Sequence, residues 1–425
     1  MRCSILLVIG TLGVAQAQQS IRLSLADAQR LAIQNNPQFS SAKYIAAAAA
    51  QVPNQYKANL LPSLSGNVTS VGADSGSRIA AGGLNNPVIY DRVGSGLTIN
   101  QLVTDFGRTS NLIGMAKLQA AAQDQVTEAT RADILLATSS AYFSVLSAQA
   151  VLKVVDETVK TRQTVVDQVT ALVDIAKSKS TVDLSFANVN LSSARLLQVQ
   201  AQNDLKAAEA RLAAAMGLPG EPNFVLTEEP MPEVMPDRVQ SLIDTAVQNR
   251  PELKDLRLQQ SAAERFAKAE HALFYPTLGV TSTAGFAPAA EAQISSRYGA
   301  IGLNISVPIF SGGLFRSRQT EAELKARAAA ENVNDLQYRV IRDVRVAFLN
   351  ATTAYDRIGL TKQLLDQAQL SMDLAQNRYD LGLADIVELS QAQLNLTSAQ
   401  IANTTARYDY QAQRVLVDYQ TGVLH

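Results

Sequence analysis

Two long stretches of the chain, residues 107–174 and 313–380, contain no proline, and each has 68 residues. At 1.5 Å per residue, either stretch predicts a helix of roughly 100 Å, far longer than a globular core requires. Apolar side chains recur every seven residues in the first stretch, which is typical of a helix packed along its whole length against another. This series is Val145, Leu152, Val159, Val166 and Val173.

The second long stretch corresponds to the first because the whole chain is an internal repeat. The sequence "AIQNNPQ" at 32–38 matches "AVQNRPE" at 246–252, and "LSFANVNLSSA" at 184–194 matches "LSQAQLNLTSA" at 389–399. Each copy is predicted to form a helix, an Asn-x-Pro step, a second helix, two strands, a long helix and a last helix, with the proline at a favourable first helical position. We expect a first repeat at 18–216, a Pro-rich and acidic linker at 217–237, and a second repeat at 238–425.

Two shorter helices are expected to stack end to end along the first long helix. They are predicted at 38–59 and 180–215, and together they nearly match its length. The last helix of each copy carries an amide, Gln198 or Asn403, at an equivalent step of its seven-residue series. An amide inside such a seam costs stability but fixes register. The alternative is that both amides lie beside the seam in water, and the spacing favours neither arrangement.

The N-terminal segment "MRCSILLVIGTLGVAQA" is predicted to be a signal peptide, residues 1–17. It has a basic residue, an apolar run too short to span a membrane, and a small-x-small cleavage signal. Cys3, the single cysteine, lies in this segment, so the mature chain is expected to form no disulfide. No later stretch offers 18 uninterrupted apolar residues, so only strands are left to cross a bilayer.

Composition gives little support to an enzyme or a nucleic-acid-binding protein. The net charge is −1, and the two histidines, His271 and His425, are far apart in the sequence. We therefore predict no catalytic site, no cofactor, no metal site and no nucleic-acid partner. No phosphate-binding loop is found either, so any energy source is expected in a partner protein.

Four short segments alternate between apolar and polar residues, the pattern of a strand with one apolar and one wet face. Each has about ten residues, the length that a tilted strand needs to cross a bilayer. The segments between paired strands, 72–95 and 287–297, are predicted to be long outer loops. The alternative is a soluble β-sandwich with aromatic residues in its core. The predicted strands lie at about 61–71, 96–106, 276–286 and 300–310.

Four strands cannot close a membrane barrel, because the smallest have about eight. An open strand edge in lipid would leave backbone groups unpaired, so the chain is predicted to oligomerise. Three chains give twelve strands and twelve helical limbs. Two chains would give eight strands, but helices beneath so small a ring would enclose little space, so geometry favours a trimer.

Several quoted motifs resemble the TolC family of bacterial outer-membrane efflux channels. They are the paired Asn-x-Pro helix restarts, "DFGR" at 105–108 and "RYDLGLADIVELSQAQLNL" at 378–396. The resemblance covers both halves and implies an α+β fold. Three chains would form a homotrimeric 12-stranded β-barrel in outer-membrane lipid, continued by a long periplasmic α-helical coiled-coil barrel. It also implies an exit duct for a tripartite efflux pump or a type I secretion system.

The resemblance further implies an adaptor-docking turn and a gate at the periplasmic tip. The docking turn, which would receive a periplasmic adaptor protein coupled to an inner-membrane pump, matches Leu381, Gly382, Leu383 and Ala384. Ala384 stands where the family has an arginine, and Lys179 is aligned with it in the first copy. Three copies of Glu388 would form an acidic ring that favours cations. The gate candidates are Tyr379, Asp183, Glu388, Lys179 and Gln391.

A second hypothesis is a periplasmic or secreted structural coiled-coil protein with a small β-sandwich head. The two hypotheses differ in the role of the strands, which cross a membrane in the first and form a soluble β-sandwich in the second. A channel would fractionate with the outer membrane as a trimer, whereas a structural protein of this kind would be a soluble monomer.

Overall fold

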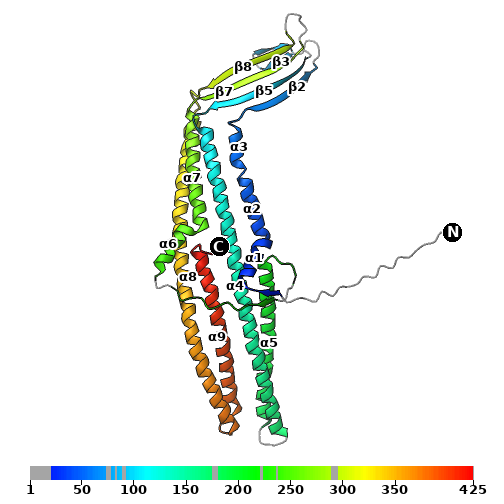
Figure 1. The fold of residues 1–425 in the computed structure, drawn as a ribbon, viewed down its shortest axis with the longest axis vertical. Coiled ribbons are helices and arrows are strands. Elements are labelled where there is room, and N and C mark those ends of the chain that lie inside the picture. The colour runs from blue at the N-terminus through cyan, green and yellow to red at the C-terminus, as the bar shows by residue number, and fades with distance from the viewer. Residues whose placement is uncertain are drawn as a thin grey trace, which may run out of the picture. The chain divides into compact units, whose positions relative to one another are not determined.

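The computed structural model describes residues 21–72, 78–81, 84–88, 92–174, 180–220, 224–235, 238–288 and 295–424 (Figure 1). The chain forms two compact units, each built from both halves of the sequence. The sheet unit comprises Ser40–Thr130 and Val247–Ile341, and the helical unit comprises Met1–Phe39, Arg131–Ala246 and Arg342–His425. The predicted signal peptide, 1–17, lies outside the described residues.

A four-stranded antiparallel sheet forms one end of the sheet unit (Figure 1). Its order is β2-β5-β7-β8, so the two halves of the sequence meet where β5 pairs with β7. The strand β8 ends four residues before the predicted 310, because Pro308 has no amide hydrogen to donate to a ladder. The strands are β2 (Ser63–Val71), β5 (Arg92–Thr104), β7 (Thr277–Phe286) and β8 (Arg297–Ser306).

The register gives this sheet one aliphatic and one polar face. Leu64 lies opposite Ile99, and Val280 lies opposite Leu303. The residues in between form the other face, where Ser65 is opposite Thr98. Many of the aliphatic side chains are exposed in the single chain, including Leu64 (66%), Val68 (81%) and Ile301 (79%). An aliphatic face of this size on an isolated sheet indicates contact with lipid or with another apolar surface.

Two glycines on the polar face make room for the Tyr298 side chain. Gly96 pairs with Gly285, which in turn pairs with Tyr298. A Cβ added at Gly96 would collide with the Tyr298 hydroxyl, whereas one added at Gly285 would also collide with the backbone oxygen of Ser95. The tyrosine therefore lies across two strands whose glycines leave space above the backbone.

Below the sheet, the helices of this unit pack through small residues. Their core is Leu112, Met115, Ala116, Ala262 and Ala269. The prediction of one helix at 38–59 is wrong, because the segment bends at residues 50–51 and restarts with Pro53 near its first position. Proline cannot continue the ladder of helical hydrogen bonds. The helices are α2 (Pro37–Ala49), α3 (Val52–Ala58), α7 (Pro251–His271), the 3-10 turn Ala272–Phe274, and the first parts of α4 (Arg108–Asp174) and α8 (Leu314–Asp380).

A buried carboxylate ties three helices together beside the sheet. Glu270, at the end of α7, is 1% exposed. Its Oε2 lies 2.6 Å from Nε of Arg318 on α8, and its Oε1 lies 3.9 Å from Nη2 of Arg108 on α4. A carboxylate buried this deeply is strongly destabilising without a paired charge, so Arg318 and Arg108, which are 43% and 34% exposed, stabilise Glu270 and link α7 to α8 and α4.

The helical unit contains the remaining parts of α4 and α8, and a small parallel sheet of β1 and β6. Tyr142 on α4 is fully buried, and its hydroxyl lies 3.0 Å from the Leu23 oxygen and 2.6 Å from the Thr227 oxygen. The linker therefore pairs with the N-terminal strand and is anchored on the long helix. The other elements are β1 (Ile21–Leu23), α1 (Leu25–Asn35), α5 (Thr181–Ala215), β6 (Phe224–Leu226), α6 (Val239–Asn249) and α9 (Ile386–Gln420).

The two seam amides each reach across to a long helix. Gln198 Nε2 donates to Asp156 Oδ1 at 2.8 Å, and Asn403 Nδ2 donates to Thr361 Oγ1 at 3.3 Å. Both amides are half-buried. They lie at the edge of the seam and still bond to its other helix, so the structure combines features of both alternatives.

Two segments differ from what the sequence predicts. The loop predicted at 72–95 contains β3 (Arg78–Ala81) paired with β4 (Leu84–Val88). Among the described residues, α4 includes an 18-residue stretch that is apolar enough to cross a membrane by composition. Of that stretch, 44% is buried within the protein, as in a packed coiled coil.

We predict opposite rescue behaviour for the two glycines beside Tyr298. Gly96→Ala should destabilise the sheet by about 1–3 kcal/mol, as overpacking does, and Tyr298→Ala should restore stability because the collision is with a side chain. Gly285→Ala should not be rescued by Tyr298→Ala, because a backbone oxygen remains in the way. The measurement is the temperature at which the folded form disappears in heated gel samples. Equal rescue of both variants would contradict this packing.

Candidate functional site: the turn between α8 and α9

The turn between α8 and α9 is fixed by backbone hydrogen bonds. Gly382 has φ +71°, a left-handed conformation that glycine adopts without cost. The Leu383 amide donates to the Arg378 oxygen at 2.8 Å, and the Gly382 amide donates to the Tyr379 oxygen at 3.1 Å. This is the Schellman pattern that ends a helix. Asp385 then caps α9 by accepting from the Glu388 amide at 2.9 Å.

The four residues predicted to dock an adaptor all lie on this turn. Leu381 is 74% exposed and Leu383 is 68% exposed. Ala384 is half-buried, and no atom outside the backbone neighbours lies within 4 Å of a Cβ built on Gly382. Two exposed leucines beside an open glycine offer an apolar contact surface, and their role in docking stays a prediction.

Tyr379 lies on the buried side of the hairpin. Its ring packs with Ala375, Ile386 and Leu389, and it is 6% exposed. Burial raises the pKa of Tyr379, and the negative charges of Asp183 and Asp380 raise it further. The phenol is therefore neutral at ordinary pH, and the structure brings the predicted Tyr379 and Asp183 together.

Asp183 is held at the start of α5. Its carboxylate accepts from the Ser180 amide at 3.0 Å, and the Ser180 hydroxyl accepts from the Val182 amide at 3.0 Å. This capping box satisfies backbone donors and places a negative charge at the positive end of the helix. Asp183 thus has a structural role in addition to its place beside Tyr379.

Glu388 has a partner that sequence reasoning missed. Arg378, in the last turn of α8, places Nε 3.1 Å from Oε1 of Glu388 and Nη2 3.5 Å from its Oε2. The same Nη2 lies 3.3 Å from the Leu383 oxygen. A basic residue in the last turn of a helix is a recognisable signal, because it complements the free carbonyl groups there.

The two remaining gate candidates are Gln391, which the structure describes, and Lys179, which it does not. Gln391 donates to Asn395 Oδ1 at 2.9 Å, one turn along α9. Lys179 lies outside the described residues. Gln391, Glu388 and Arg378 line a groove of about 590 Å³ between α8 and α9, with Leu370 and Leu374 on its wall. The predicted set thus divides into the buried Tyr379 beside the half-buried Asp183, and an exposed polar group around Glu388.

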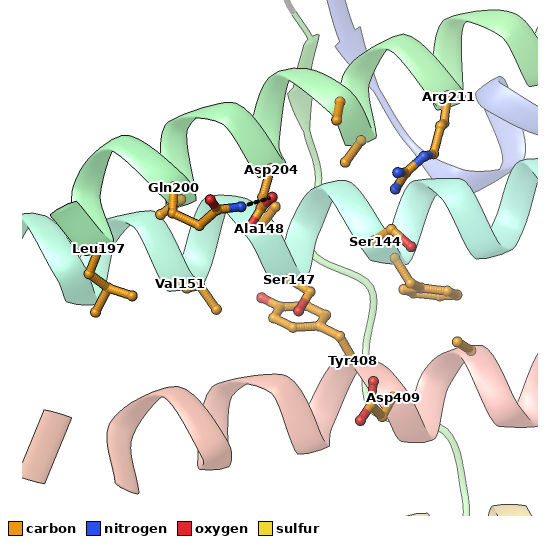
Figure 2. Close-up of a pocket in the computed structure, with 15 residues that line it drawn as sticks. Ser144, Ser147, Ala148, Val151, Leu197, Gln200, Asp204, Arg211, Tyr408 and Asp409 are labelled. Carbon is orange, nitrogen blue, oxygen red and sulfur yellow. Dashed lines mark hydrogen bonds between the residues drawn. The ribbon is translucent and has the colours of Figure 1, made fainter. Parts of the chain in front are cut away.

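A second cleft in the helical unit lies between α4, α5 and α9 (Figure 2). Its volume is about 360 Å³, and Gln200 Nε2 donates to Asp204 Oδ1 at 2.8 Å on its wall. Arg211, Tyr408 and Asp409 also line it. None of the predicted site residues belongs to this cleft. Over the described ranges, no cluster of three or more His, Cys, Asp or Glu side chains has the arrangement of a metal site.

An exposed aliphatic sheet face together with 67-residue coiled-coil helices defines a class of protein, the outer-membrane channel with a helical extension. Comparison with known sequences supports this class. The model of the family described as "Outer membrane efflux protein" matches residues 28–218 and 242–422. The chain belongs to this family.

Curated relatives bear related names. "Outer membrane protein TolC" of Escherichia coli (strain K12) is 25% identical over 415 residues, covering 92% of this chain and 80% of the relative. "Alkaline protease secretion protein AprF" of Pseudomonas aeruginosa is 24% identical over 420 residues, covering 96% of this chain and 86% of the relative. The predicted family, the predicted channel class and the outer-membrane location are therefore confirmed.

Solved structures share the fold. The outer-membrane channel OprN has a TM-score of 0.81 at 18% identity, covering 94% of this chain and 89% of that one. VceC of Vibrio cholerae has a TM-score of 0.78 at 20% identity, covering 94% and 96%. The predicted class of fold, long helices with a small sheet, is confirmed by these likenesses.

We predict that the same substitution at two glycines of α8 and its turn has opposite effects. Gly382→Ala should destabilise the turn by about 1 kcal/mol, because alanine resists a positive φ. Gly359→Ala, in open space inside α8, should stabilise that helix by roughly 0.5–1 kcal/mol. Hydrogen exchange of the local amides measures both effects. Faster exchange around 381–386 is expected only in the first variant, and slower exchange there would contradict the turn geometry.

Proposed function

We propose that three copies of this chain form a closed 12-stranded barrel in the outer membrane. The observation that carries the proposal is the sheet, in which, among the described residues, no strand pairs with the outer side of β2 or β8. In lipid, each unpaired backbone group would cost several kcal/mol, roughly the value for burying an unsatisfied amide. Pairing β8 of one copy with β2 of the next removes all edges when three copies close a ring.

The two faces of the sheet suit this arrangement. The face with Leu64, Ile99, Val280 and Leu303 turns to lipid, and the serine- and threonine-rich face turns to an aqueous lumen. The strands have 9 to 13 residues, which is enough for a tilted crossing. The coiled coils continue the lumen as a periplasmic tunnel. The product is a passive duct for efflux or type I secretion, driven by an inner-membrane pump.

The proposed domain organisation is two repeats joined by a linker. The repeats are 18–216 and 238–425, and the linker is 217–237. Equal element lengths support it, since α4 and α8 have 67 residues each and α5 and α9 have 35 each. Cleavage of the segment 1–17 on export completes the proposal. Six such units then build the trimer.

At the periplasmic tip, the turn of Leu381, Gly382, Leu383 and Ala384 is proposed to receive a periplasmic adaptor. Two exposed leucines offer it an apolar contact. The gate is proposed to involve Tyr379 and Asp183 on the buried side, with Glu388, Gln391 and Lys179 at the opening. Docking of the adaptor and pump would separate these contacts and open the duct.

The assembly is tested by fractionation of cells that produce the chain. We expect it in the outer membrane as a trimer that resists detergent and falls to monomer mobility only after heating, because barrel closure removes every free edge. A matched variant with Ile301→Asp should fail to assemble, since it places a charge on the lipid face. Recovery of the unaltered chain as a soluble monomer would refute the channel and favour a structural coiled coil.

The gate is tested by conductance. Glu388→Ala combined with Lys179→Ala should raise the single-channel conductance in planar bilayers, because two charged side chains proposed for the gate are lost. Lys325→Ala with Glu321→Ala removes an exposed ion pair at 2.6 Å elsewhere on α8 and serves as control. Unchanged conductance in the first variant would defeat the assignment of these residues to the gate.

A further inference from the structure

The exposed surface of α9 near the turn carries two different stripes. One is apolar, with Val387 (50% exposed) and Leu394 (51% exposed) seven residues apart. The other is polar and follows steps of three or four residues along one face: Glu388, Gln391, Asn395 and Ser398, all exposed. A seven-residue apolar spacing is typical of a surface that meets another helix, whereas an unbroken polar stripe suits contact with water. The polar stripe is therefore the one fit to line an aqueous passage.

Arg378 lies across from this polar stripe, on α8. Its guanidinium contacts both carboxylate oxygens of Glu388, at 3.1 and 3.5 Å. It is also anchored by the Leu383 oxygen at 3.3 Å. The two side chains are 55% and 45% exposed, so both remain accessible to ions in solution. Fork-like contact of this kind gives an arginine–carboxylate pair a defined geometry.

The pair changes the electrostatics expected at the tip. Glu388 alone, in three copies, would present three negative charges to a passing ion and favour cations. With a guanidinium on each carboxylate, the charge of each copy of the pair is zero. At distances of several ångströms, an ion then meets the weak field of a dipole instead of the field of a free charge. Gln391, one turn further along α9, adds no charge.

We propose that Arg378 determines the ion selectivity of the conduit by neutralising Glu388. The proposal rests on the function proposed above, because it needs the polar stripe of α9 to line the lumen of an assembled channel. Arg378 acts in it as a selectivity residue that faces the permeating ion together with Glu388. The Arg378–Glu388 pair itself then favours neither sign of small ion.

The experiment measures reversal potentials of the full-length channel in planar bilayers under a tenfold KCl gradient. Arg378→Gln should raise the permeability ratio of K⁺ to Cl⁻ at least twofold, because three carboxylates become unpaired. Glu388→Gln should lower the ratio by a similar factor, because three guanidinium groups become unpaired. The double variant should return to the unaltered value, and Arg378→Lys, which keeps the charge, should stay close to it.

Arg339→Gln serves as the matched control. It removes an exposed arginine that pairs with Asp335 at 2.9 Å elsewhere on α8, and the ratio should not change. Assembly of each variant is checked by the heat-dependent gel mobility of the trimer. If Arg378→Gln did not assemble, Glu388→Gln and Arg378→Lys would still decide the question.

The possible failures are distinguishable. If the unaltered chain forms no channels, the proposed function itself is wrong. If it conducts but Arg378→Gln and Glu388→Gln both leave the reversal potential unchanged, Arg378 does not set selectivity, and the duct stands. If Arg378→Lys shifts the ratio as strongly as Arg378→Gln, the shape of the side chain rather than its charge is responsible, which also overturns the inference.

Discussion

The rest of the structure depends on one constraint: a strand in lipid must pair its backbone groups on both sides. The sheet satisfies it internally for β5 and β7, where strands from the two halves of the sequence meet. Within the described part of the chain, β2 and β8 each keep one open edge. A duplicated chain joined in this way supplies two repeats per copy, and only association with further copies removes the edges. The apolar sheet face and the proposed assembly thus answer the same requirement.

The helices meet a different requirement, to remain continuous and close-packed over 67 residues. Alanine recurs at the buried positions of both units, which lets helices approach closely. Glycines with positive φ, Gly217, Gly382 and Gly422, end α5, α8 and α9 through the same backbone pattern. Because backbone bonds fix the α8–α9 turn, the side chains of Leu381 and Leu383 are free to contact other proteins.

Much of this was predictable because the signals are local. The long helices were expected at 107–174 and 313–380. Each begins one residue later than expected, directly after a glycine, and ends at the expected aspartate. Pro53 was a local signal for the break between α2 and α3, but the helix-favouring residues around it led to the prediction of a single helix. The partner of Glu388 had only a general signal, a basic residue in the last turn of α8, because Arg378 reaches the carboxylate only once the turn has folded. The pairing of β1 with β6 joins segments about 200 residues apart, and no spacing rule reveals such a contact.

The division of the tip into a buried and an exposed group has a physical consequence. Tyr379 is packed in the hairpin beside Asp183 on α5, so its substitution disturbs how α8 sits against a neighbouring helix. The Arg378–Glu388 pair is half-exposed, and pairs of this kind contribute only about 0–1 kcal/mol to stability. Its charges can therefore change with little effect on the fold. Tyr379 and Asp183 are therefore suited to hold the tip in one arrangement, and the exposed group, besides its proposed part in closing the tip, is suited to control which ions pass.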